Sequence, residues 1–295
     1  MAGKFAKAVI GFLLLGAVAS AARAQAPAVE AAQPLILRNT ETRDIHSDIN
    51  GVDYRLYVSL PRGYGESEER YRTLYLLDAD YSFLIVRNVV EHFADRGNVP
   101  PMIIVGVAYP GGVEDLGVYR RNRTRDYTPT HTPEGGYGPE IQALSGGGPA
   151  FRDFLGDELI PYIDRQYRTN GVRGLSGHSF GGLFATFVML TRPELFDDYL
   201  IVSPSLWYDE GVIFRIEDAY AANHDDLPAR AMFTVGAYEN QPQNGRAMVD
   251  DMMRLRALLE GRGYAGFESF AHVFEGETHN SVYPAAITRS LSVLY

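Results

Sequence analysis

The sequence contains no cysteine in its 295 residues. A chain without thiols has no disulfide framework, no cysteine nucleophile and no thiolate ligand for zinc. Lysine is almost as scarce, because Lys4 and Lys7 are its only occurrences. The rest of the chain therefore offers no lysine for a Schiff base, a pyridoxal cofactor or a phosphate-binding P-loop. These absences leave serine chemistry as the main catalytic option.

Metal-binding patterns and excess positive charge are missing as well. The seven histidines show no spacing typical of a zinc-binding helix, and no motif implies a metal or an organic cofactor. The formal net charge is −10 at pH 7. An acidic chain of this kind is a poor partner for nucleic acid or anionic lipid. Composition therefore favours a small-molecule substrate and leaves the oligomeric state open.

The first 24 residues are typical of a secretory signal peptide. Lys4 and Lys7 form a basic start, residues 8–20 are apolar, and the Ala-Arg-Ala run at 22–24 supplies a cleavage site. We expect cleavage after Ala24, a periplasmic or secreted protein, and no stable membrane association. An uncleaved anchor is the alternative, although the apolar run is short for a bilayer span. Residues 25–38, rich in Ala and Pro, predict a flexible leader.

From residue 39 to residue 295 the pattern predicts a single α/β domain. Two strand-like stretches flank an Asn50-Gly51 hairpin turn and predict an antiparallel amino-terminal edge. The alternation that follows predicts a mostly parallel central sheet with helices on both faces. Strands are expected at 72–77, 102–107, 172–176, 199–202, 231–235 and 266–274, and helices near 82–95, 150–168, 182–190, after 207, at 245–261 and from 284.

Residues 110–148 interrupt this alternation with Gly, Pro, Thr, Tyr and Arg in no clear period. A structureless connection of this length inside a domain is usually a lid or a binding loop. We expect the segment to lie over the active site. A disordered insertion is the alternative.

A Gly-His-Ser-Phe-Gly motif at residues 177–181 lies between a predicted strand and a predicted helix. In a nucleophile elbow this arrangement exposes a serine hydroxyl, and the flanking glycines make room for the tight turn. Ser179 is therefore the candidate nucleophile, provided that a histidine and a carboxylate reach it. Because the chain has 30 glycines, an ordinary Gly-Ser turn is the alternative.

Two further side chains are expected at the same edge of the sheet. Glu239 and His279 each follow a predicted strand, and the carboxyl ends of parallel strands are where α/β sheets bind ligands. The order Ser179, Glu239, His279 is the order of a triad led by an elbow serine. His279 would be the base and Glu239 the acid that orients it.

Each partner has rivals in the sequence. His272 lies inside the last predicted strand, and Asp250 and Asp251 lie inside the helix after Glu239. His178 adjoins the nucleophile, but neighbours on a turn point apart, so we expect it to pack at the elbow.

Acyl transfer also requires hydrogen-bond donors aimed at the developing oxyanion. The backbone N–H of Phe180, at the start of the predicted helix, is the first candidate. The second is the amide of Asp80, in the loop after the strand at 72–77.

Five motifs together resemble the putative-esterase family of α/β-hydrolases: Leu-Leu-Asp-Ala-Asp at 76–80, Gly-His-Ser-Phe-Gly-Gly at 177–182, Ser-Pro-Ser-Leu-Trp at 203–207, Val-Gly-Ala-Tyr-Glu at 235–239 and Gly-Glu-Thr-His at 276–279. That family includes enterochelin and bacillibactin esterases, S-formylglutathione hydrolases and mycolyltransferases. The resemblance runs from about residue 40 to the carboxyl terminus. It implies Ser179 as nucleophile, His279 as base and Glu239 as acid. Ala79 replaces the family's usual glycine in the oxyanion loop, and some members work with a Ser-His pair alone.

The substrate is predicted least sharply. Guanidinium groups in the 110–148 segment suit an acidic or catecholate group, and a salt-bridged loop that includes Asp126 is the alternative. Trp207 suits an aromatic pocket, with a core position as the alternative. The resemblance implies a siderophore or aryl ester. The candidate substrate-binding residues are Arg123, Arg125 and Trp207, with Arg120 and Arg121 beside them.

These features predict an exported, cofactor-free serine hydrolase that cleaves small-molecule carboxylic esters through an acyl-serine intermediate. An acyltransferase with the same triad is one alternative, and a non-catalytic binding protein on a hydrolase fold is another. A broken triad would mark the binding protein.

Overall fold

The computed structural model describes residue 3 and residues 32–241 and 246–295. Residues Arg38–Tyr295 form one compact unit. The predicted signal peptide and cleavage site, and the leader up to residue 31, lie outside the described residues. Within the described ranges, no helix has the length and apolar character needed to cross a membrane.

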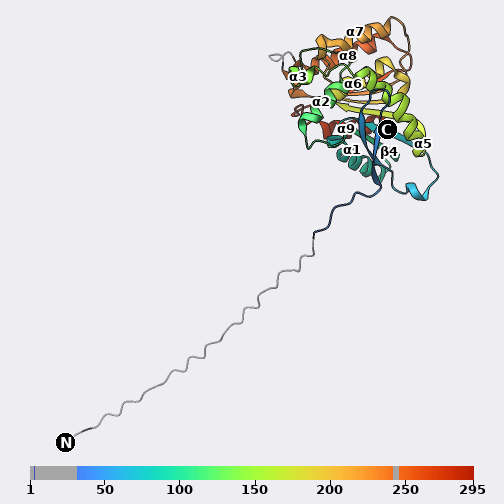
Figure 1. Ribbon diagram of the computed structural model, residues 1–295, viewed down its shortest axis with the longest axis vertical. Helices are drawn as coiled ribbons and strands as arrows, with labels where there is room; N and C mark the ends of the chain where they lie inside the picture. Colours follow the sequence, from blue (N-terminus) through green and yellow to red (C-terminus); the bar gives the residue numbers. More distant parts are fainter. Residues whose placement is uncertain (1–2, 4–31, 242–245) are drawn as a thin grey trace. The chain divides into compact units, whose positions relative to one another are not determined.

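A central sheet with helices packed around it forms this unit (Figure 1). The sheet has eight strands in the order β1-β2-β4-β3-β5-β6-β7-β10. β1 pairs antiparallel with β2 and β2 with β4, whereas every later pair is parallel. The predicted α/β-hydrolase fold, with its antiparallel amino-terminal edge, is confirmed. The strands are β1 (Thr40–His46), β2 (Asp53–Ser59), β3 (Tyr71–Leu76), β4 (Met102–Ala108), β5 (Thr169–His178), β6 (Asp198–Val202), β7 (Arg230–Gly236) and β10 (Glu268–Phe274).

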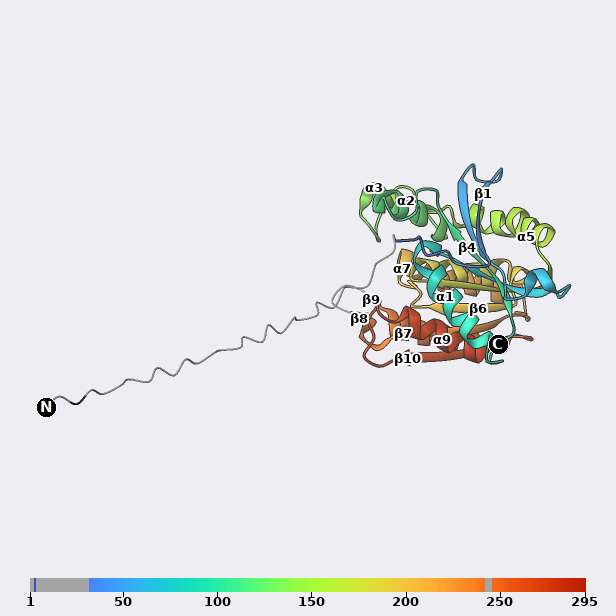
Figure 2. The same cartoon turned by 90° about the horizontal axis from the view of Figure 1, so that it is seen from below.

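Helices cover both faces of the sheet, as predicted. Figure 2 shows α1 (Ala79–Ala94) and α9 (Tyr283–Leu294) side by side over one face, where they enclose one apolar cluster. A larger cluster fills the other face. Its helices are α4 (Gly148–Asp153), α5 (Ile160–Gln166), α6 (Phe180–Thr191), α7 (Tyr208–Ala221) and α8 (Met248–Arg262), with a π-helical stretch at Phe154–Leu159 between α4 and α5.

Burial explains which strand patterns the sequence shows. All seven residues of β4 and all five of β6 are buried, because both faces of these central strands are covered. In β2, near the edge, Tyr54, Leu56 and Val58 are buried and alternate with more exposed neighbours. The Asn50-Gly51 turn joins β1 to β2 as predicted, and Gly51 takes a positive φ of 68° there.

The segment 110–148 is not a structureless loop, and that prediction is wrong. It contains α2 (Leu116–Tyr127) and the short α3 (Pro139–Gln142). Asp115 caps α2 by accepting hydrogen bonds from the amides of Gly117 and Val118. The buried residues of α2 include Arg123, Thr124 and Asp126. Because these polar side chains occupy positions where a helix usually buries apolar ones, α2 lacks the apolar period by which helices are recognised.

The parallel strands end at one edge of the sheet, and this edge positions the candidate site. Each residue in question lies at or shortly after the carboxyl end of a strand. They are Asp78 after β3, Ser179 after β5, Ser203 after β6, Glu239 after β7 and His279 after β10.

Candidate active site

Ser179 occupies a strained turn between β5 and α6, with φ 63° and ψ −118°. A non-glycine residue holds such a conformation only where its surroundings enforce it. A Cβ at Gly177 would lie 2.2 Å from the carbonyl oxygen of Gly181, so that position accepts only glycine. The Ser179 amide donates to the Val202 carbonyl at 3.0 Å, which fixes the turn against β6. The predicted elbow is therefore present.

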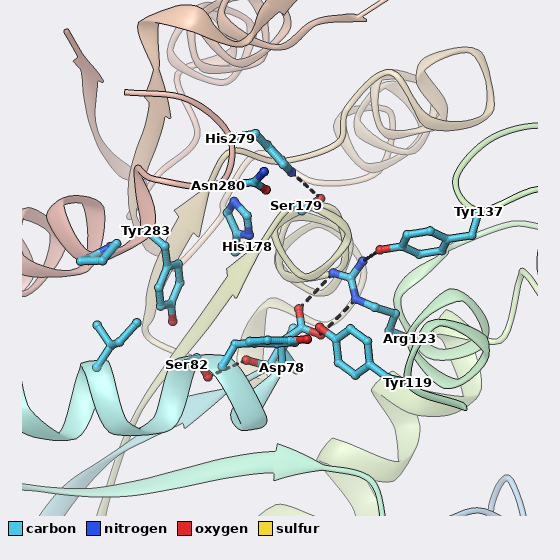
Figure 3. Close-up of a pocket in the computed structure, with 14 residues that line it drawn as sticks. Asp78, Ser82, Tyr119, Arg123, Tyr137, His178, Ser179, His279, Asn280 and Tyr283 are labelled. Carbon is cyan, nitrogen blue, oxygen red and sulfur yellow. Dashed lines mark hydrogen bonds and ion pairs between the residues drawn. The ribbon is translucent and has the colours of Figure 1, made fainter. Parts of the chain in front are cut away.

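His279 lies between Ser179 and Glu239, in hydrogen-bond contact with both. Its Nε2 is 2.9 Å from the Ser179 Oγ (Figure 3). Its Nδ1 is 2.6 Å from Oε2 of Glu239. The three residues come from segments after β5, β7 and β10, as predicted. A base within reach of the hydroxyl and an acid on its far nitrogen are what general-base activation of a serine requires.

Glu239 is held as a buried carboxylate. Its Oε1 accepts hydrogen bonds from the Ser203 hydroxyl and the Gly236 amide, both at 2.7 Å. Burial alone would raise the pKa of Glu239, but the hydrogen bonds from His279, Ser203 and Gly236 lower it below its ordinary value. The carboxylate therefore stays ionised and can hold a proton on Nδ1 of His279. Ser203 was missed from the sequence, although its place directly after a strand was a usable signal.

The rival residues lie elsewhere. His272 is within β10 with its ring 4.4 Å from that of Phe274, and Asp250 and Asp251 are in the first turn of α8. None of these three lines the pockets at Ser179. His178 packs at the elbow as expected. Contrary to the expectation that it points away from the site, His178 lines the first of the pockets at Ser179, and its ring packs against that of His279.

Two pockets meet at Ser179, with volumes of about 420 and 410 Å³. Both are lined by Ser179, His279, Asn280, Arg123 and Tyr137. The first, here the tyrosine pocket, is drawn in Figure 3. The tyrosine pocket adds Leu77, Asp78, Tyr81, Ser82, Ile85, Tyr119, His178, Tyr283 and Pro284. The second, the tryptophan pocket, adds Gly136, Phe180, Ser205, Trp207, Glu239, Arg246 and Met248.

Arg123 lines both pockets, as predicted for a substrate contact, but its charge is already paired. Its Nε and Nη2 donate to the two carboxylate oxygens of Asp78, each at 3.0 Å. Its Nη1 donates to the Tyr137 hydroxyl at 2.8 Å. Both side chains of the ion pair are buried. Five N–H donors make up a guanidinium, so two remain for a ligand.

Trp207 lies in the tryptophan pocket, where the sequence predicted an aromatic wall. The guanidinium of Arg246 lies 4.7 Å from the centre of the indole ring. Arg246 was not predicted, because no motif or strand end marks it. The tryptophan pocket therefore combines an aromatic face with a cation that no described acid pairs.

Arg125 lies outside both pockets, and the prediction that it binds substrate is wrong. Its Nε and Nη2 donate to the buried Asp126 at 2.7 and 2.9 Å. Asp126 also accepts hydrogen bonds from the hydroxyls of Tyr54 and Tyr109. The salt-bridged alternative therefore applies to Arg125.

The carboxylate of Asp80 faces away from the site and accepts a hydrogen bond from Tyr57 at 2.7 Å. Asp80 lines neither pocket, so the role of its amide stays a prediction.

Among the described residues, no group of three or more His, Asp or Glu side chains is placed to hold a metal ion.

The backbone amides of the loop after β3 can be accounted for individually. The Asp78 amide donates to the Tyr127 hydroxyl at 3.0 Å, and the amides of Tyr81 and Ser82 donate to the Asp78 carbonyl. The amides of residues 79–80 begin α1 and have no partner within the helix. The first amide of α6, that of Phe180, is in the same position. The first amides of α1 and of α6 are therefore free of helical partners.

A family model described as "Putative esterase" matches residues 47–292 of the chain. The chain belongs to this family. Ferri-bacillibactin esterase BesA of Bacillus subtilis is 29% identical over 85% of this chain and 88% of its own length. The siderophore triacetylfusarinine C esterase of Aspergillus fumigatus is 28% identical over 89% of this chain and 95% of its own length. The family model and these esterase relatives together support an ester hydrolase.

Solved structures agree with the family assignment. An IroE-like serine hydrolase from Shewanella oneidensis superposes with a TM-score of 0.76, at 29% identity, over 87% of this chain and 80% of its own. The siderophore hydrolase EstA from Aspergillus nidulans gives a TM-score of 0.77, at 25% identity, over 90% of this chain and 98% of its own. The esterase family that the motifs resembled is therefore confirmed.

Proposed function

We propose that this protein is an exported serine hydrolase that cleaves carboxylic esters through an acyl-serine intermediate. The observation that carries the proposal is the hydrogen-bonded chain from Glu239 through His279 to the Ser179 hydroxyl, at the junction of two pockets. An acid, a base and a hydroxyl in this geometry form the catalytic unit of serine esterases.

In the first half of the reaction, His279 Nε2 takes the Ser179 proton as Oγ attacks the ester carbonyl carbon. Negative charge develops on the carbonyl oxygen, and the amides of Phe180 and Asp80 are the donors that we assign to it. The tetrahedral intermediate collapses, the alcohol leaves with the proton from His279, and an acyl-serine remains.

The second half returns the enzyme to its starting state. A water molecule loses a proton to His279 and attacks the acyl carbon. The acid leaves, and Ser179 recovers its proton from the imidazole. Throughout, the ionised Glu239 keeps the imidazole oriented and stabilises its charged form.

The two pockets suggest an ester with a bulky group on each side of the scissile bond. In the tryptophan pocket, Trp207 offers a face for an aromatic ring, while Arg246 and the two remaining donors of Arg123 suit acidic oxygens. Two relatives carry siderophore esterase names, and the siderophores in those names are ester compounds. We therefore infer siderophore or aryl esters as the substrate class.

Turnover of a p-nitrophenyl ester tests the nucleophile. We expect Ser179→Ala to lower kcat by roughly 10⁶-fold, as removal of a triad serine does in subtilisin. The matched control is Ser290→Ala, a buried serine in α9 that donates to the Ala286 carbonyl and lines neither pocket. Turnover that survives in Ser179→Ala would remove the serine from the mechanism.

Product analysis tests the reaction type and the substrate. Hydrolysis predicts the free acid as product even when an alcohol acceptor is added, whereas a new ester made from the acceptor would indicate an acyltransferase. A catecholate triester should be cleaved with a higher kcat/KM than p-nitrophenyl acetate. The reverse ranking would contradict the substrate proposal.

Export is supported by the sequence of residues 1–24. Expression of the full chain in a Gram-negative host should give a periplasmic or secreted product whose first residue is Gln25. A cytoplasmic product that retains the first 24 residues would contradict this part of the proposal.

A further inference from the structure

One face of α2 converges on a single residue of the oxyanion loop. Tyr119, Arg123 and Tyr127 are spaced four residues apart, so they lie on the same face of the helix. All three contact Asp78. Tyr119 donates its hydroxyl to Oδ1 at 2.6 Å, Arg123 donates to both carboxylate oxygens, and the Tyr127 hydroxyl accepts the Asp78 amide at 3.0 Å. We call these three residues the α2 clamp.

Asp78 has a backbone conformation that needs such support. It lies in the left-handed region, with φ 51° and ψ 47°, directly before the first residue of α1. A residue with a Cβ is disfavoured there, and it persists only where its contacts determine its conformation. The α2 clamp holds the side chain and the amide of Asp78, while its carbonyl accepts the amides of Tyr81 and Ser82.

The position of Asp78 determines where α1 begins. Once its own amide and the amides of Tyr81 and Ser82 are used, the amides of residues 79–80 are left without a helical partner. Asp78 also lies against the start of α6, because a Cβ at Gly181 would be 3.5 Å from its Oδ2. The loop is therefore fixed from α2 on one side and borders the elbow on the other.

We propose that Asp78 is a positioning residue, held by the α2 clamp so that the amide of Asp80 points at the oxyanion. This inference rests on the proposed esterase function and deepens it. It assigns a task to the segment 110–148 beyond covering the site. In Figure 3, Arg123 and Tyr119 approach Asp78 from the right, and the Arg123 guanidinium lies between Asp78 and Ser179. Asp78, Tyr119 and Arg123 also line the tyrosine pocket, whereas Tyr127 lines neither pocket.

Tyr127→Phe is the sharpest test, because it deletes one oxygen from the clamp and leaves the buried ring. The matched control is Tyr109→Phe, another buried tyrosine, whose hydroxyl donates to Asp126 away from the pockets. Loss of an oxyanion donor costs about 10²- to 10³-fold in kcat, so a misaimed donor should cost about tenfold. We expect that loss in Tyr127→Phe, with KM within about twofold, and less than twofold loss of kcat in Tyr109→Phe.

A phenylboronic acid supplies a readout that a purely structural role would not change. Its tetrahedral adduct on serine places an oxygen where the oxyanion forms. We expect its inhibition constant to rise in Tyr127→Phe by the same factor by which kcat falls, because both depend on the same donor. Thermal melting of both tyrosine variants separates this effect from a loss of folded protein.

A second variant, Asp78→Asn, keeps the shape and tolerates the left-handed backbone, but removes the charge that pairs Arg123. We expect a fall in kcat of about 10²-fold, as for full loss of the donor. If this variant does not fold, Tyr127→Phe still decides the question.

Three outcomes would overturn the inference. The first is a loss of kcat in Tyr127→Phe that is no larger than the loss in Tyr109→Phe. The second is a phenylboronic acid inhibition constant that stays unchanged in Tyr127→Phe although kcat falls, and the third is full kcat in folded Asp78→Asn. Ser179→Ala in the same assay separates this failure from failure of the proposed function. Turnover that persists in Ser179→Ala would contradict the proposed esterase mechanism itself. Turnover that is lost in Ser179→Ala but unchanged in the clamp variants would contradict only the role of Asp78.

Discussion

The imidazole of His178 packs in a tilted arrangement against that of His279, with ring centres 4.5 Å apart and planes inclined by 35°. Tyr283 packs edge-on against the same ring of His178. A ring packed in this way restricts rotation of His279 away from the line between Ser179 and Glu239. Burial, together with the nearby charges of His279 and Arg123, lowers the pKa of His178 to about 3. His178 is therefore a neutral platform that adds no charge beside the imidazolium formed during reaction.

Replacement of His178 should separate ring packing from other roles. His178→Phe keeps an aromatic ring beneath His279 and should retain kcat within about threefold, whereas His178→Ala frees the imidazole and should lower kcat roughly tenfold. Steady-state turnover of a p-nitrophenyl ester measures both. Equal losses in the two variants would show that the packed ring does not hold the base.

His178 should also make stability depend on pH. The pKa of His178 in the folded protein lies below the value of about 6.5 expected for the unfolded chain. Between about pH 6.5 and pH 3 the unfolded state therefore binds more protons, and the free energy of unfolding falls as the pH falls. His178→Phe removes this contribution.

Urea unfolding measures the free energy of unfolding of wild type and of His178→Phe. The two conditions are pH 7.5 and pH 5, which lie on either side of about 6.5. Wild type should lose more stability than His178→Phe between the two conditions. An equal loss would mean that His178 does not titrate differently on folding.

Glu239→Gln asks whether the acid is required or whether a Ser-His pair suffices. The glutamine side chain has the same shape but no negative charge, so it cannot stabilise the charged imidazole of His279. We therefore expect kcat to fall by roughly 10⁴-fold, as it does when the buried acid of a serine protease triad is replaced by its amide. Glu260→Gln, an exposed position in α8 that pairs with Arg256, is the matched control. Near-normal turnover in Glu239→Gln would show that the pair of Ser179 and His279 is sufficient for catalysis.

Gly177→Ala tests the elbow. The added methyl group would meet the Gly181 carbonyl oxygen at 2.2 Å, so we expect loss of folded, active protein. Gly261→Ala is the control, since nothing lies within 4 Å of a Cβ there. In the helix α8 this change should raise the free energy of unfolding by about 0.5–1 kcal/mol. Thermal melting and turnover of both variants check the pair, and a stable, active Gly177→Ala would contradict the elbow geometry.

Topology explains why much of the site could be predicted from the sequence. Ser179, Glu239 and His279 each follow a strand, and parallel strands bring such residues to one edge whatever their separation in the chain. The apolar runs of β4 and β6 and the Asn50-Gly51 turn are local signals, and they placed the strands and the antiparallel edge.

The rest depends on contacts that no local pattern records. α2 was missed because it buries Arg123 and Asp126 in ion pairs. Arg123 and Arg125 are two residues apart and look alike in the sequence, yet one reaches Asp78 at the pocket and the other pairs with Asp126 in the core. Only the packing of α2 against the sheet decides which guanidinium faces a ligand.

The most direct test of Ser179 as the nucleophile is covalent labelling of the protein with a fluorophosphonate, followed by peptide mapping. We expect one modified residue, Ser179, and no label in Ser179→Ala, while Ser290→Ala labels as wild type does. Labelling at another serine, or an unlabelled protein that still cleaves esters, would contradict the claim that Ser179 is the nucleophile.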